Sequence, residues 1–318
     1  MNVEDPKIVD EKFLSKKCAW LYYVAKLNQN QIAKKIGLSK MRVHRLIAFA
    51  EKNGFVKTFV EGGFDKTTKY EEIIKQKYNL KICEVIPNDE INNDPLQMLG
   101  AAGARFIMSQ INENNINEFG IGTGRTMFSV AKWLPKIEKK INVISLNGSL
   151  TYNNAIRTRT VMSQISDKII GECFATGMPL IIETIEQRKI VEKIKFVKDI
   201  MNKANNTKIK IFGVGGLDNS AQIVKTKIFS KDTVIRLKED GAVGEVGGNF
   251  FNIHGKLISN EETSKVLAAD SNYFNKSMTV LIAGGKNKIK QIKSVLKSEL
   301  FFGLITDEAT AKIIIKNN

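Results

Sequence analysis

Histidine and cysteine are scarce in this chain of 318 residues, and their scarcity narrows the chemistry it can perform. The two histidines, His44 and His254, nearly exclude a histidine-based metal site or a serine–histidine–aspartate triad. The three cysteines, Cys18, Cys83 and Cys173, lie far apart in the sequence. Their separations do not match metal-ligand spacing, and a disulfide framework is not expected. We therefore predict no metal ion and no cofactor.

Long apolar runs are also missing, since no stretch approaches the length needed to cross a membrane. The N-terminus, MNVEDPKIVDEK, carries charges of both signs and does not have the form of a signal peptide. Hydrophobic residues make up 43% of the chain and charged residues 26%, a balance typical of globular proteins. We predict a soluble cytoplasmic protein with no membrane partner, built as one large domain or as one large and one small.

Positive charge is abundant and unevenly distributed. The net charge is +16, and the sequence pI is about 9.6. Eleven basic residues and a single acid, Glu51, occur between Lys12 and Lys57, so +10 of the surplus lies in roughly the first sixth of the chain. A bias toward lysine codons would spread the charge evenly. The concentration therefore favours an acidic partner such as nucleic acid.

The basic segment has the apolar periodicity of three short helices, expected at about 11–26, 29–36 and 40–52. Gly37 ends the second helix, because glycine tolerates the positive φ of a C-terminal cap. Ser39 is a good N-cap for the third helix. The side chains that the third helix is expected to bury are Met41, Val43, Leu46, Ile47 and Ala50.

The spacing of Ala33, Gly37 and Val43 is that of a helix-turn-helix motif, in which a small residue allows the two helices to cross closely. The second helix of such a pair enters the DNA major groove with its early outward side chains at the base edges. We therefore predict a DNA-binding domain over residues 1–60, although a small basic helical hairpin would show a similar pattern. The predicted DNA contacts are Gln29, Ser39, Lys40, Arg42, His44 and Arg45.

Beyond the basic segment the chain alternates between short strands and helices. Strands are expected in KICEVIPN, INEFGIG, INVISLN, TKIKIFGVGG, MTVLIAGG and FFGLITD, with helices between them, one of them over residues 187–204. Strand–loop–helix units in series indicate an α/β domain with a mainly parallel sheet, over residues 61–318. A short strand is expected at 58–64, and the amphipathic helix DKTTKYEEIIKQKYNLK is interpreted as a connector or a dimer contact.

The glycine-rich turn GIGTGRT, residues 120–126, follows one predicted strand and opens a helix. In open α/β sheets, ligands bind beyond the carboxyl ends of the strands. The glycines let the backbone approach an anion, while Thr123, Arg125 and Thr126 offer hydroxyls and a positive charge where the helix dipole favours anions. The turn matches neither G-x-x-x-x-G-K-[ST] nor G-x-G-x-x-G, so it predicts an anion site without naming a nucleotide.

Further polar residues follow the other predicted strands. Lys286 adds a positive charge, Glu245 and Asp307 can accept hydrogen bonds from sugar hydroxyls, and Asn147 and Gly148 lie in an NGS turn. Together these groups suit a polyol or a sugar phosphate. Simpler interpretations stand beside this one: Asp307 is the N-cap of the last helix, GVGG is a tight turn, and KNKIKQIK is a solvated helix face.

These residues resemble those of the SorC family of sugar-binding transcriptional regulators, which includes DeoR-like deoxynucleoside regulators. The resemblance runs from roughly Phe13 to the end and rests on AWLYYVAKLNQNQIAKKIGLSKMRVHRLIAFAEKNGFV, GIGTGRT, GAVGEVGGNFFNIHGK, VLIAGGKNKIKQI and LITDEATA. It implies an all-α helix-turn-helix headpiece joined to a large Rossmann-like α/β effector domain that resembles sugar-phosphate isomerases. It also implies a homo-oligomer, a dimer or tetramer, and a small phosphorylated sugar as effector.

The same resemblance implies which residues contact the effector, with the phosphate held by GTGRT. Glu245 stands where the family often has Asp, and its extra methylene is expected to change which sugar fits. Asn147 replaces one residue of a more usual double glycine and cannot form an imine as a lysine could, so the effector is expected to bind without covalent attachment. The predicted effector contacts are Gly122, Thr123, Gly124, Arg125, Thr126, Asn147, Gly148, Glu245, Lys286 and Asp307.

The combined features predict a transcriptional regulator that is not an enzyme, with double-stranded operator DNA, a phosphorylated sugar and further copies of itself as partners. An effector would bias two arrangements of the oligomer, only one of which spaces the headpieces for an operator. The alternative is a sugar-phosphate isomerase-type enzyme with a fused basic domain, in which Glu245, Asp307 and Lys286 act as acid and base groups. A metabolic protein that binds RNA is a third and weaker hypothesis.

Overall fold

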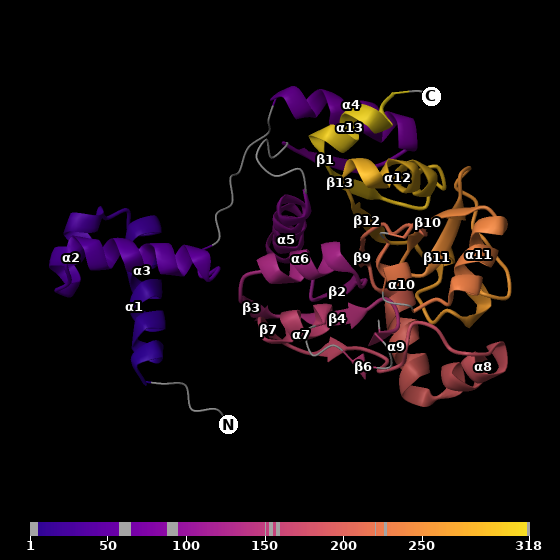
Figure 1. The fold of residues 1–318 in the computed structure, drawn as a ribbon, viewed down its shortest axis with the longest axis horizontal. Coiled ribbons are helices and arrows are strands. Elements are labelled where there is room, and N and C mark those ends of the chain that lie inside the picture. Colours follow the sequence, from indigo (N-terminus) through magenta and orange to yellow (C-terminus); the bar gives the residue numbers. More distant parts are fainter. Residues whose placement is uncertain are drawn as a thin grey trace. The chain divides into compact units, whose positions relative to one another are not determined.

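The computed structural model divides the chain into two compact units, Met1–Glu61 and Gly62–Asn318. Figure 1 labels the elements of each unit along the chain. The strand expected at 58–64 lies outside the described residues. The structure describes residues 6–56, 65–87, 95–149, 151–152, 155–156, 160–219, 221–225 and 228–316.

Three helices make up the small unit: α1 (Pro6–Tyr23), α2 (Gln29–Ile36) and α3 (Lys40–Lys52). The second and third have the predicted bounds. The first begins earlier and ends earlier than the predicted 11–26, and Lys26, with a φ of 56°, lies in the turn that follows it.

Local caps explain why α2 and α3 begin and end where they do. Asn28 and Gln31 form a reciprocal capping box at the start of α2, with both hydrogen bonds at 2.9 Å. Gly37 ends α2 with a φ of 71°, and the Ser39 hydroxyl accepts a hydrogen bond from the Arg42 backbone N–H at 3.2 Å. Each of these caps satisfies backbone groups that a helix end leaves unpaired.

The core of the small unit is made by apolar side chains from all three helices. Val43, Leu46, Ile47 and Ala50 of α3 are buried as predicted, at the spacing of one helix face. The expectation for Met41 was wrong, because its side chain is 71% exposed. Position 41 lies two residues before Val43, which puts it on the opposite side of the helix.

A seven-stranded sheet, parallel throughout, forms the centre of the large unit, in the order β1-β13-β12-β9-β2-β4-β8. This arrangement confirms the predicted α/β fold class, and strands form in all six predicted segments. The strands are β1 (Ile82–Ile86), β2 (Glu118–Ile121), β4 (Asn142–Ser145), β8 (Cys173–Phe174), β9 (Ile209–Phe212), β12 (Met278–Ile282) and β13 (Gly303–Asp307).

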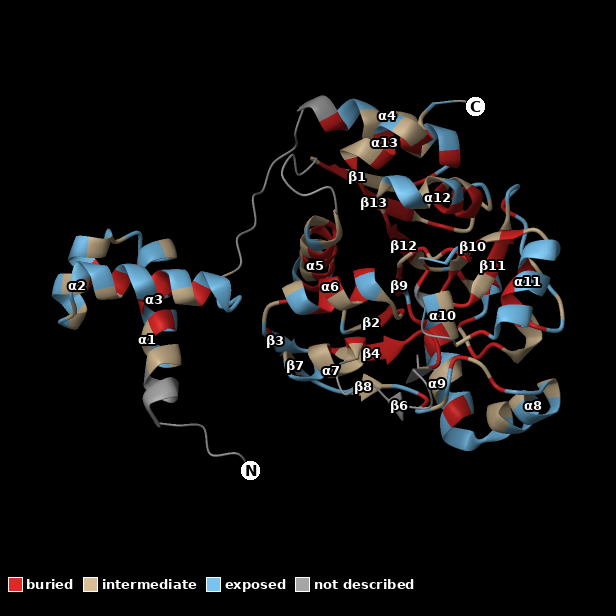
Figure 2. Ribbon diagram, in the orientation of Figure 1, coloured by how far each residue is buried: buried red, intermediate tan, exposed pale blue. Residues whose placement is uncertain are grey.

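Two apolar layers cover the two faces of this sheet, because neighbouring residues on a strand point to opposite sides. Ile211 and Phe212 of β9, for example, belong to different clusters. Helices α5 (Leu96–Glu113), α6 (Arg125–Trp133) and α7 (Val161–Ser166) pack on one face. The helices on the other face are α4 (Asp65–Tyr78), α9 (Lys195–Asn206), α12 (Ile289–Leu296) and α13 (Glu308–Ile314), and the strands between the layers are buried (Figure 2).

The connections reverse direction between β2 and β9. The chain leads from β2 through α6 to β4 on one side, whereas β9 leads onward to β12 on the other side. The carboxyl ends of β2 and β9 are therefore neighbours whose following segments separate. In an open α/β sheet such a switch point opens a crevice for a ligand.

The helix expected over residues 187–204 is two helices, α8 (Ile185–Lys193) and α9. Ile194 has extended backbone angles, φ −62° and ψ 122°, and links the two. No residue of α8 is buried, whereas Val197 and Ala204 of α9 are completely buried. The break lets α9 pack on the sheet while α8 stays at the surface.

Smaller elements complete the large unit, and none of its described helices is long and apolar enough to cross a membrane. The additional helices are α10 (Gln222–Lys225), α11 (Lys231–Glu239) and the short 3-10 segments η1 (Thr263–Lys265), η2 (Ser271–Tyr273) and η3 (Lys286–Lys288). The additional strands form three pairs: β10 (Ala242–Val246) with β11 (Asn249–Asn252), β3 (Ile137–Lys140) with β7 (Ile169–Ile170), and β5 (Thr151–Tyr152) with β6 (Ala155–Ile156).

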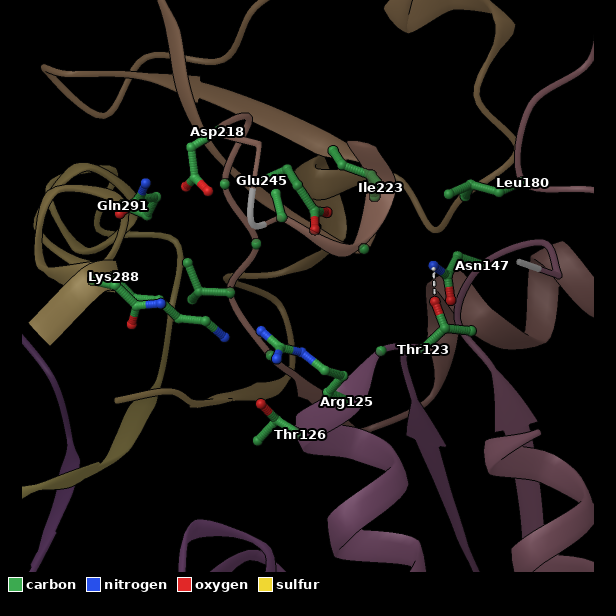
Figure 3. Close-up of a pocket in the computed structure, with 18 residues that line it drawn as sticks. Thr123, Arg125, Thr126, Asn147, Leu180, Asp218, Ile223, Glu245, Lys288 and Gln291 are labelled. Atoms are coloured by element: carbon green, nitrogen blue, oxygen red, sulfur yellow. Dashed lines mark hydrogen bonds between the residues drawn. The ribbon is translucent and has the colours of Figure 1, made fainter. Parts of the chain in front are cut away.

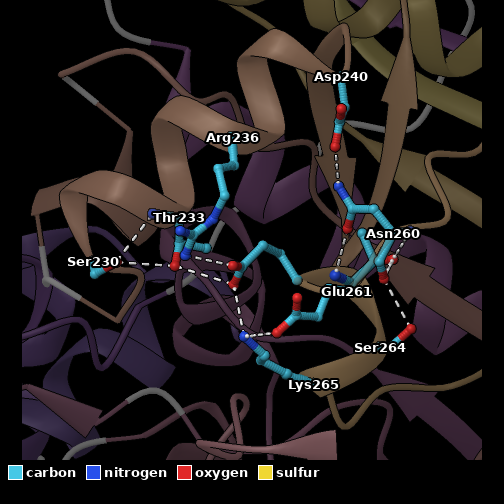
Figure 4. A network of polar contacts seen from close by, with 10 residues as sticks. Ser230, Thr233, Arg236, Asp240, Asn260, Glu261, Ser264 and Lys265 are labelled. Atoms are coloured by element: carbon cyan, nitrogen blue, oxygen red, sulfur yellow. Dashed lines mark hydrogen bonds and ion pairs between the residues drawn. The ribbon is translucent and has the colours of Figure 1, made fainter.

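A buried carboxylate fastens α11 to η1 beside the β10–β11 hairpin. Glu262 accepts a hydrogen bond from the Thr233 hydroxyl at 3.1 Å and pairs with Arg236 at 2.5 Å and Lys265 at 3.5 Å. Figure 4 shows the three donors converging. Because a buried carboxylate is tolerated only when it is paired, these contacts hold the segments together as one body. The β10–β11 hairpin, which contains Glu245, follows α11 in the chain.

Candidate functional site

A cleft lies at the carboxyl ends of β2, β4 and β9, where the chain reverses direction. The turn after β2 contributes Thr123 to Thr126, the turn after β9 contributes Gly213 to Gly216, and Asn147 follows β4. The hairpin contributes Glu245, and the start of α12 contributes Lys288 and Gln291 (Figure 3). Segments distant in the sequence therefore meet at one cleft.

The turn after β2 presents an uncapped helix end to this cleft. Helix α6 begins at Arg125, and its N-cap is Gly124, whose φ of 110° suits glycine. No side chain in the described part of the chain caps the helix, so its first backbone N–H groups face the cleft without an intrahelical partner. Together with the helix dipole, these N–H groups make a site for an anion.

Two cationic side chains extend into the space beyond this helix end. Arg125 has an exposed side chain that forms no ion pair with any described residue, and Lys288 approaches from the opposite wall (Figure 3). Thr126 adds a hydroxyl below Arg125. The arrangement supplies two positive charges and oriented N–H groups, which is the donor set that a phosphate group needs.

Hydrogen-bond acceptors also line the cleft. Glu245 has a carboxyl whose pKa is raised because burial disfavours its charge, although the Gly248 N–H and Lys288 act in the opposite direction. Its Oε2 accepts the hydrogen bond from Gly248 at 2.9 Å. Its backbone pairs with Gly215 through hydrogen bonds of 2.9 and 3.0 Å. The carboxyl is thus held at the cleft with Oε1 available to a ligand.

Glu245 fits here only because position 215 has no side chain. A Cβ at Gly215 would lie 2.0 Å from Oε1 of Glu245, closer than atoms can approach. The glycine turn after β9 and the acid on the hairpin therefore form a matched pair. The sequence alone left GVGG open as a simple turn, and the structure brings it to the cleft wall.

Two residues of the cleft lining, Asn147 and Gln291, each have a buried amide oxygen that accepts no hydrogen bond from a described residue. The Asn147 Nδ2 donates a hydrogen bond to the Thr123 hydroxyl at 3.0 Å, but its Oδ1 has no hydrogen-bond partner among the described residues. The same is true of Oε1 of Gln291. Because a buried acceptor without a partner raises the free energy of the protein, both oxygens point to a ligand that carries hydroxyl donors.

Six of the ten predicted effector contacts line the cleft, namely Thr123, Gly124, Arg125, Thr126, Asn147 and Glu245. Gly122 and Gly148 have packing functions: added Cβ atoms would lie 2.8 Å from the Phe212 ring and 2.5 Å from the Pro179 carbonyl oxygen. Neither glycine belongs to the lining.

Lys286 and Asp307 also lie outside the cleft lining. Asp307 is buried and caps α13, where it accepts hydrogen bonds from the Thr310 N–H and from the Gly285 N–H, both at 2.9 Å. This is the capping function that the sequence also allowed. Lys286 lines a separate groove, and Lys288, two residues later, extends into the cleft instead. Sequence reasoning missed Lys288 and Gln291 because the 3-10 turn η3 decides which side chain faces which way.

In the small unit, the predicted DNA contacts come from α2, from α3 and from the turn between them. Lys40, His44 and Arg45 are exposed, opposite the buried stripe that begins at Val43. Arg42 is partly buried and pairs with Glu11 of α1 at 3.0 Å. The hydroxyl of Ser39 serves as the N-cap, and Gln29 is the first residue of α2.

Known proteins match this chain over both of its units. Residues 63–316 match the family described as "Putative sugar-binding domain". The erythritol catabolism regulatory protein EryD of Brucella abortus is 34% identical over 303 residues, which cover 95% of this chain and 96% of that protein. The deoxyribonucleoside regulator of Bacillus subtilis is 25% identical over 320 residues, covering 97% and 99%.

Solved structures share the fold. The full-length sorbitol operon regulator SorC from Klebsiella pneumoniae matches with a TM-score of 0.69 at 20% identity, covering 96% of this chain and 100% of that one. A DeoR family transcriptional regulator from Listeria monocytogenes matches with a TM-score of 0.70 at 19% identity, covering 78% and 99%. The first of these structures spans the small helical unit as well as the large one.

Proposed function

Because the chain belongs to the family of sugar-binding transcriptional regulators of the SorC and DeoR type, we propose that it binds operator DNA and that a small phosphorylated sugar or polyol sets its DNA affinity. The observation that carries the effector part is the polarity of the cleft. An uncapped helix end with Arg125 and Lys288 supplies positive charge, and around it lie acceptors that have no partner among the described residues. A ligand with an anionic group and several hydroxyls satisfies both kinds of group.

The phosphate binds at the start of α6, through the N–H groups of the first turn and the Arg125 guanidinium. The hydroxyls donate to Glu245 Oε1, Asn147 Oδ1 and Gln291 Oε1. A phosphorylated four-carbon polyol is the first candidate, since EryD, named for erythritol catabolism, is 34% identical to this chain. Asn147 has no nucleophilic amine, so this position forms no imine with the effector.

The DNA part of the proposal rests on the small unit. Its α3 exposes Lys40, His44 and Arg45 on a capped helix, which is the surface that a helix-turn-helix places in the major groove. Residues 1–60 are the DNA-binding domain, and residues 61–318 bind the effector and form the dimer or tetramer. The protein acts in the cytoplasm, where a bacterial regulator meets its DNA.

The same site argues against the isomerase alternative. Of the three groups proposed as acid and base, only Glu245 lines the cleft, while Asp307 caps a helix and Lys286 lies elsewhere. The three groups predicted to act as acid and base are therefore not within reach of one substrate, and the relatives are named as regulators. We therefore propose binding without turnover.

A thermal-shift panel tests the effector assignment, because a ligand that binds only the folded state raises Tm. The panel contains phosphorylated erythritol, pentose phosphates and hexose phosphates, each beside its unphosphorylated parent. We expect a phosphorylated member to raise Tm, an Arg125→Gln variant to lose the response, and a Lys189→Gln variant on α8 to keep it. Equal responses to a phosphate and its parent would refute the phosphate assignment.

A gel-shift titration of the same variants tests the coupling to DNA. Arg125→Gln should bind duplex DNA as the parent protein does but should no longer respond to the effector. If the effector changed DNA binding of both proteins equally, the cleft would not be the sensing site.

A further inference from the structure

Positive charge is concentrated in a second region, away from the small unit. Residues 1–61 contain 12 basic and 6 acidic residues, and five of these acids lie outside the basic run Lys12–Lys57, so the net charge of the small unit is +6. The remaining 257 residues carry +10. Half of that surplus comes from the twelve residues 286–297, which contain five lysines and no acid. The large unit is therefore itself basic, and its charge is localised.

Four of these lysines lie on the segment formed by η3 and α12. Lys286 belongs to η3, Lys290 and Lys293 belong to α12, and Lys297 is its C-cap. Lys290, Lys293 and Lys297 recur at intervals of three and four residues, which places them on one face of the helix. They line a groove of about 880 Å³, a volume within the range of small-molecule sites. Lys77 of α4 and Lys316, just after α13, line the same groove, and the acidic residue in its described lining is Glu299.

Backbone carbonyls fix several of these ammonium groups without exhausting their donors. Lys293 donates to the Lys316 carbonyl at 3.3 Å, and Lys297 donates to the Ile253 carbonyl at 3.2 Å. Each ammonium has three N–H donors, so these single bonds hold the groups in place and leave donors for a ligand. Lys286 and Lys290 are exposed and form no ion pair with any described residue.

The groove holds a positive field that its own residues do not neutralise. The pKa of Lys77 is lowered, first by burial and then by repulsion from Lys293 and Lys297. Its ammonium stays in place because it donates to the carbonyls of Ile314, Ile315 and Lys316, at 3.0, 3.1 and 3.3 Å, so Lys77 contributes its charge to the groove and no further donor. A merely solvated face would not converge from three elements, α4, α12 and α13, on one hollow. Lysines facing one another across a groove repel unless an anion lies between them.

One short segment forms a wall of both the groove and the cleft. Asn287 and Gln291 line both, Lys286 and Lys290 line the groove, and Lys288 extends into the cleft (Figure 3). Movement of residues 286–291 toward an anion in the groove must therefore change the position of two cleft groups.

We propose that this groove is a second anion site, for a small molecule that carries two or more phosphate groups, and that its occupancy is transmitted to the cleft through residues 286–291. The number of ammonium groups favours several phosphates over a single one. The compact groove suits a small polyanion, which it can surround with lysines. The proposal that the groove binds an anion does not depend on the proposed function. The proposal that this binding changes how the cleft binds its effector rests on the function proposed above.

Isothermal titration of the full chain with sodium tripolyphosphate tests the binding. We expect a Lys286→Gln/Lys290→Gln variant to bind at least roughly tenfold more weakly, because it loses two charge-assisted contacts. A Lys189→Gln/Lys198→Gln variant, with the same change of charge on α8 and α9, should bind normally, as should Arg125→Gln. Equal weakening in both double variants, or equal heat from sulfate at matched ionic strength, would reduce the effect to general screening and overturn the proposal.

The Arg125→Gln variant also separates the groove from the cleft. If this variant lost tripolyphosphate binding while Lys286→Gln/Lys290→Gln retained it, the anion would occupy the cleft and the groove proposal would be wrong. Binding that depends on the groove lysines, in a chain that responds to no sugar phosphate, would instead refute only the proposed function.

Hydrogen exchange measured by mass spectrometry tests the transmission. Tripolyphosphate should slow amide exchange in residues 286–297 and also change exchange in the cleft turns 122–127 and 213–216. Protection confined to 286–297 would overturn the coupling and leave a simple binding groove.

Discussion

Substituting Gly215 by alanine should reveal how tightly the cleft is built around Glu245. The new Cβ would lie 2.0 Å from Oε1, 2.9 Å from Cδ and 3.1 Å from Cγ of Glu245. The carboxyl must then move, and its hydrogen bond from the Gly248 N–H at 2.9 Å is strained or lost. Overpacking of this kind costs about 1–3 kcal/mol. For a domain of this size that corresponds to a fall in Tm of roughly 2–4 °C per kcal/mol.

The cause can be isolated with a double-mutant cycle. Glu245→Ala removes Cγ, Cδ and Oε1, the three atoms that the new Cβ would approach most closely. In that background Gly215→Ala should cost less than about 1 kcal/mol, giving a coupling of roughly 1 kcal/mol or more. Urea unfolding at neutral pH measures all four proteins, provided that the m-values agree.

A neighbouring glycine supplies the control. A Cβ at Gly213 would meet Thr126 at 3.5 Å, an ordinary contact, so Gly213→Ala should change stability by less than about 0.5 kcal/mol. If Gly215→Ala and Glu245→Ala were additive, or if both glycine variants behaved alike, the proposed fit between the turn and the carboxyl would be refuted.

Three further predictions follow from other contacts. Burial lowers the pKa of Lys210 to about 8, so as the pH rises the folded state releases this proton before the unfolded state does. The free energy of unfolding should therefore rise by up to about 3 kcal/mol between pH 8 and 10. Urea unfolding measures this rise, and the Lys210→Met variant should lack it. Arg45→Ala should weaken binding to duplex DNA roughly tenfold or more in a gel shift while sparing effector affinity; equal loss of both would contradict separate sites. Glu11→Gln removes the partner of Arg42 at 3.0 Å and should strengthen DNA binding about two- to fivefold with little change in Tm, because an exposed pair contributes little; weaker binding would show that Glu11 positions Arg42 instead.

Local signals explain why the small unit could be predicted well from the sequence. The bounds of α2 and α3 depend on Asn28, Gly37 and Ser39, whose capping chemistry acts within three or four residues. The break at Ile194 could not be predicted in this way, because apolar periodicity continues across it. What separates α8 from α9 is the burial of Val197 against the rest of the large unit, a tertiary contact that no local pattern contains.

The cleft residues can be divided in the same way, into those with a local sequence signal and those without one. Thr123, Arg125 and Thr126 were predicted because a glycine turn between a strand and a helix marks an anion site by itself. Lys286 was predicted where Lys288 is found, because the two lysines are equivalent until the 3-10 turn assigns them to opposite sides of one wall. The positive charge of the groove was not predicted either. Counting charges along the chain emphasises the dense run of basic residues in the small unit and not the five lysines of residues 286–297.

The cleft contains several polar groups that the other described residues do not satisfy. The first N–H groups of α6 have no cap, Asn147 Oδ1 and Gln291 Oε1 have no partner among the described residues, and burial raises the pKa of Glu245. Each raises the free energy of this arrangement, and one ligand with an anion at one end and hydroxyls at the other relieves all of them. A ligand can shift a conformational equilibrium only by its difference in affinity for the two states. Because these groups lie on four separate segments, an arrangement that separates the segments loses the ligand contacts, and that difference is the free energy with which an effector can act on the DNA-binding unit.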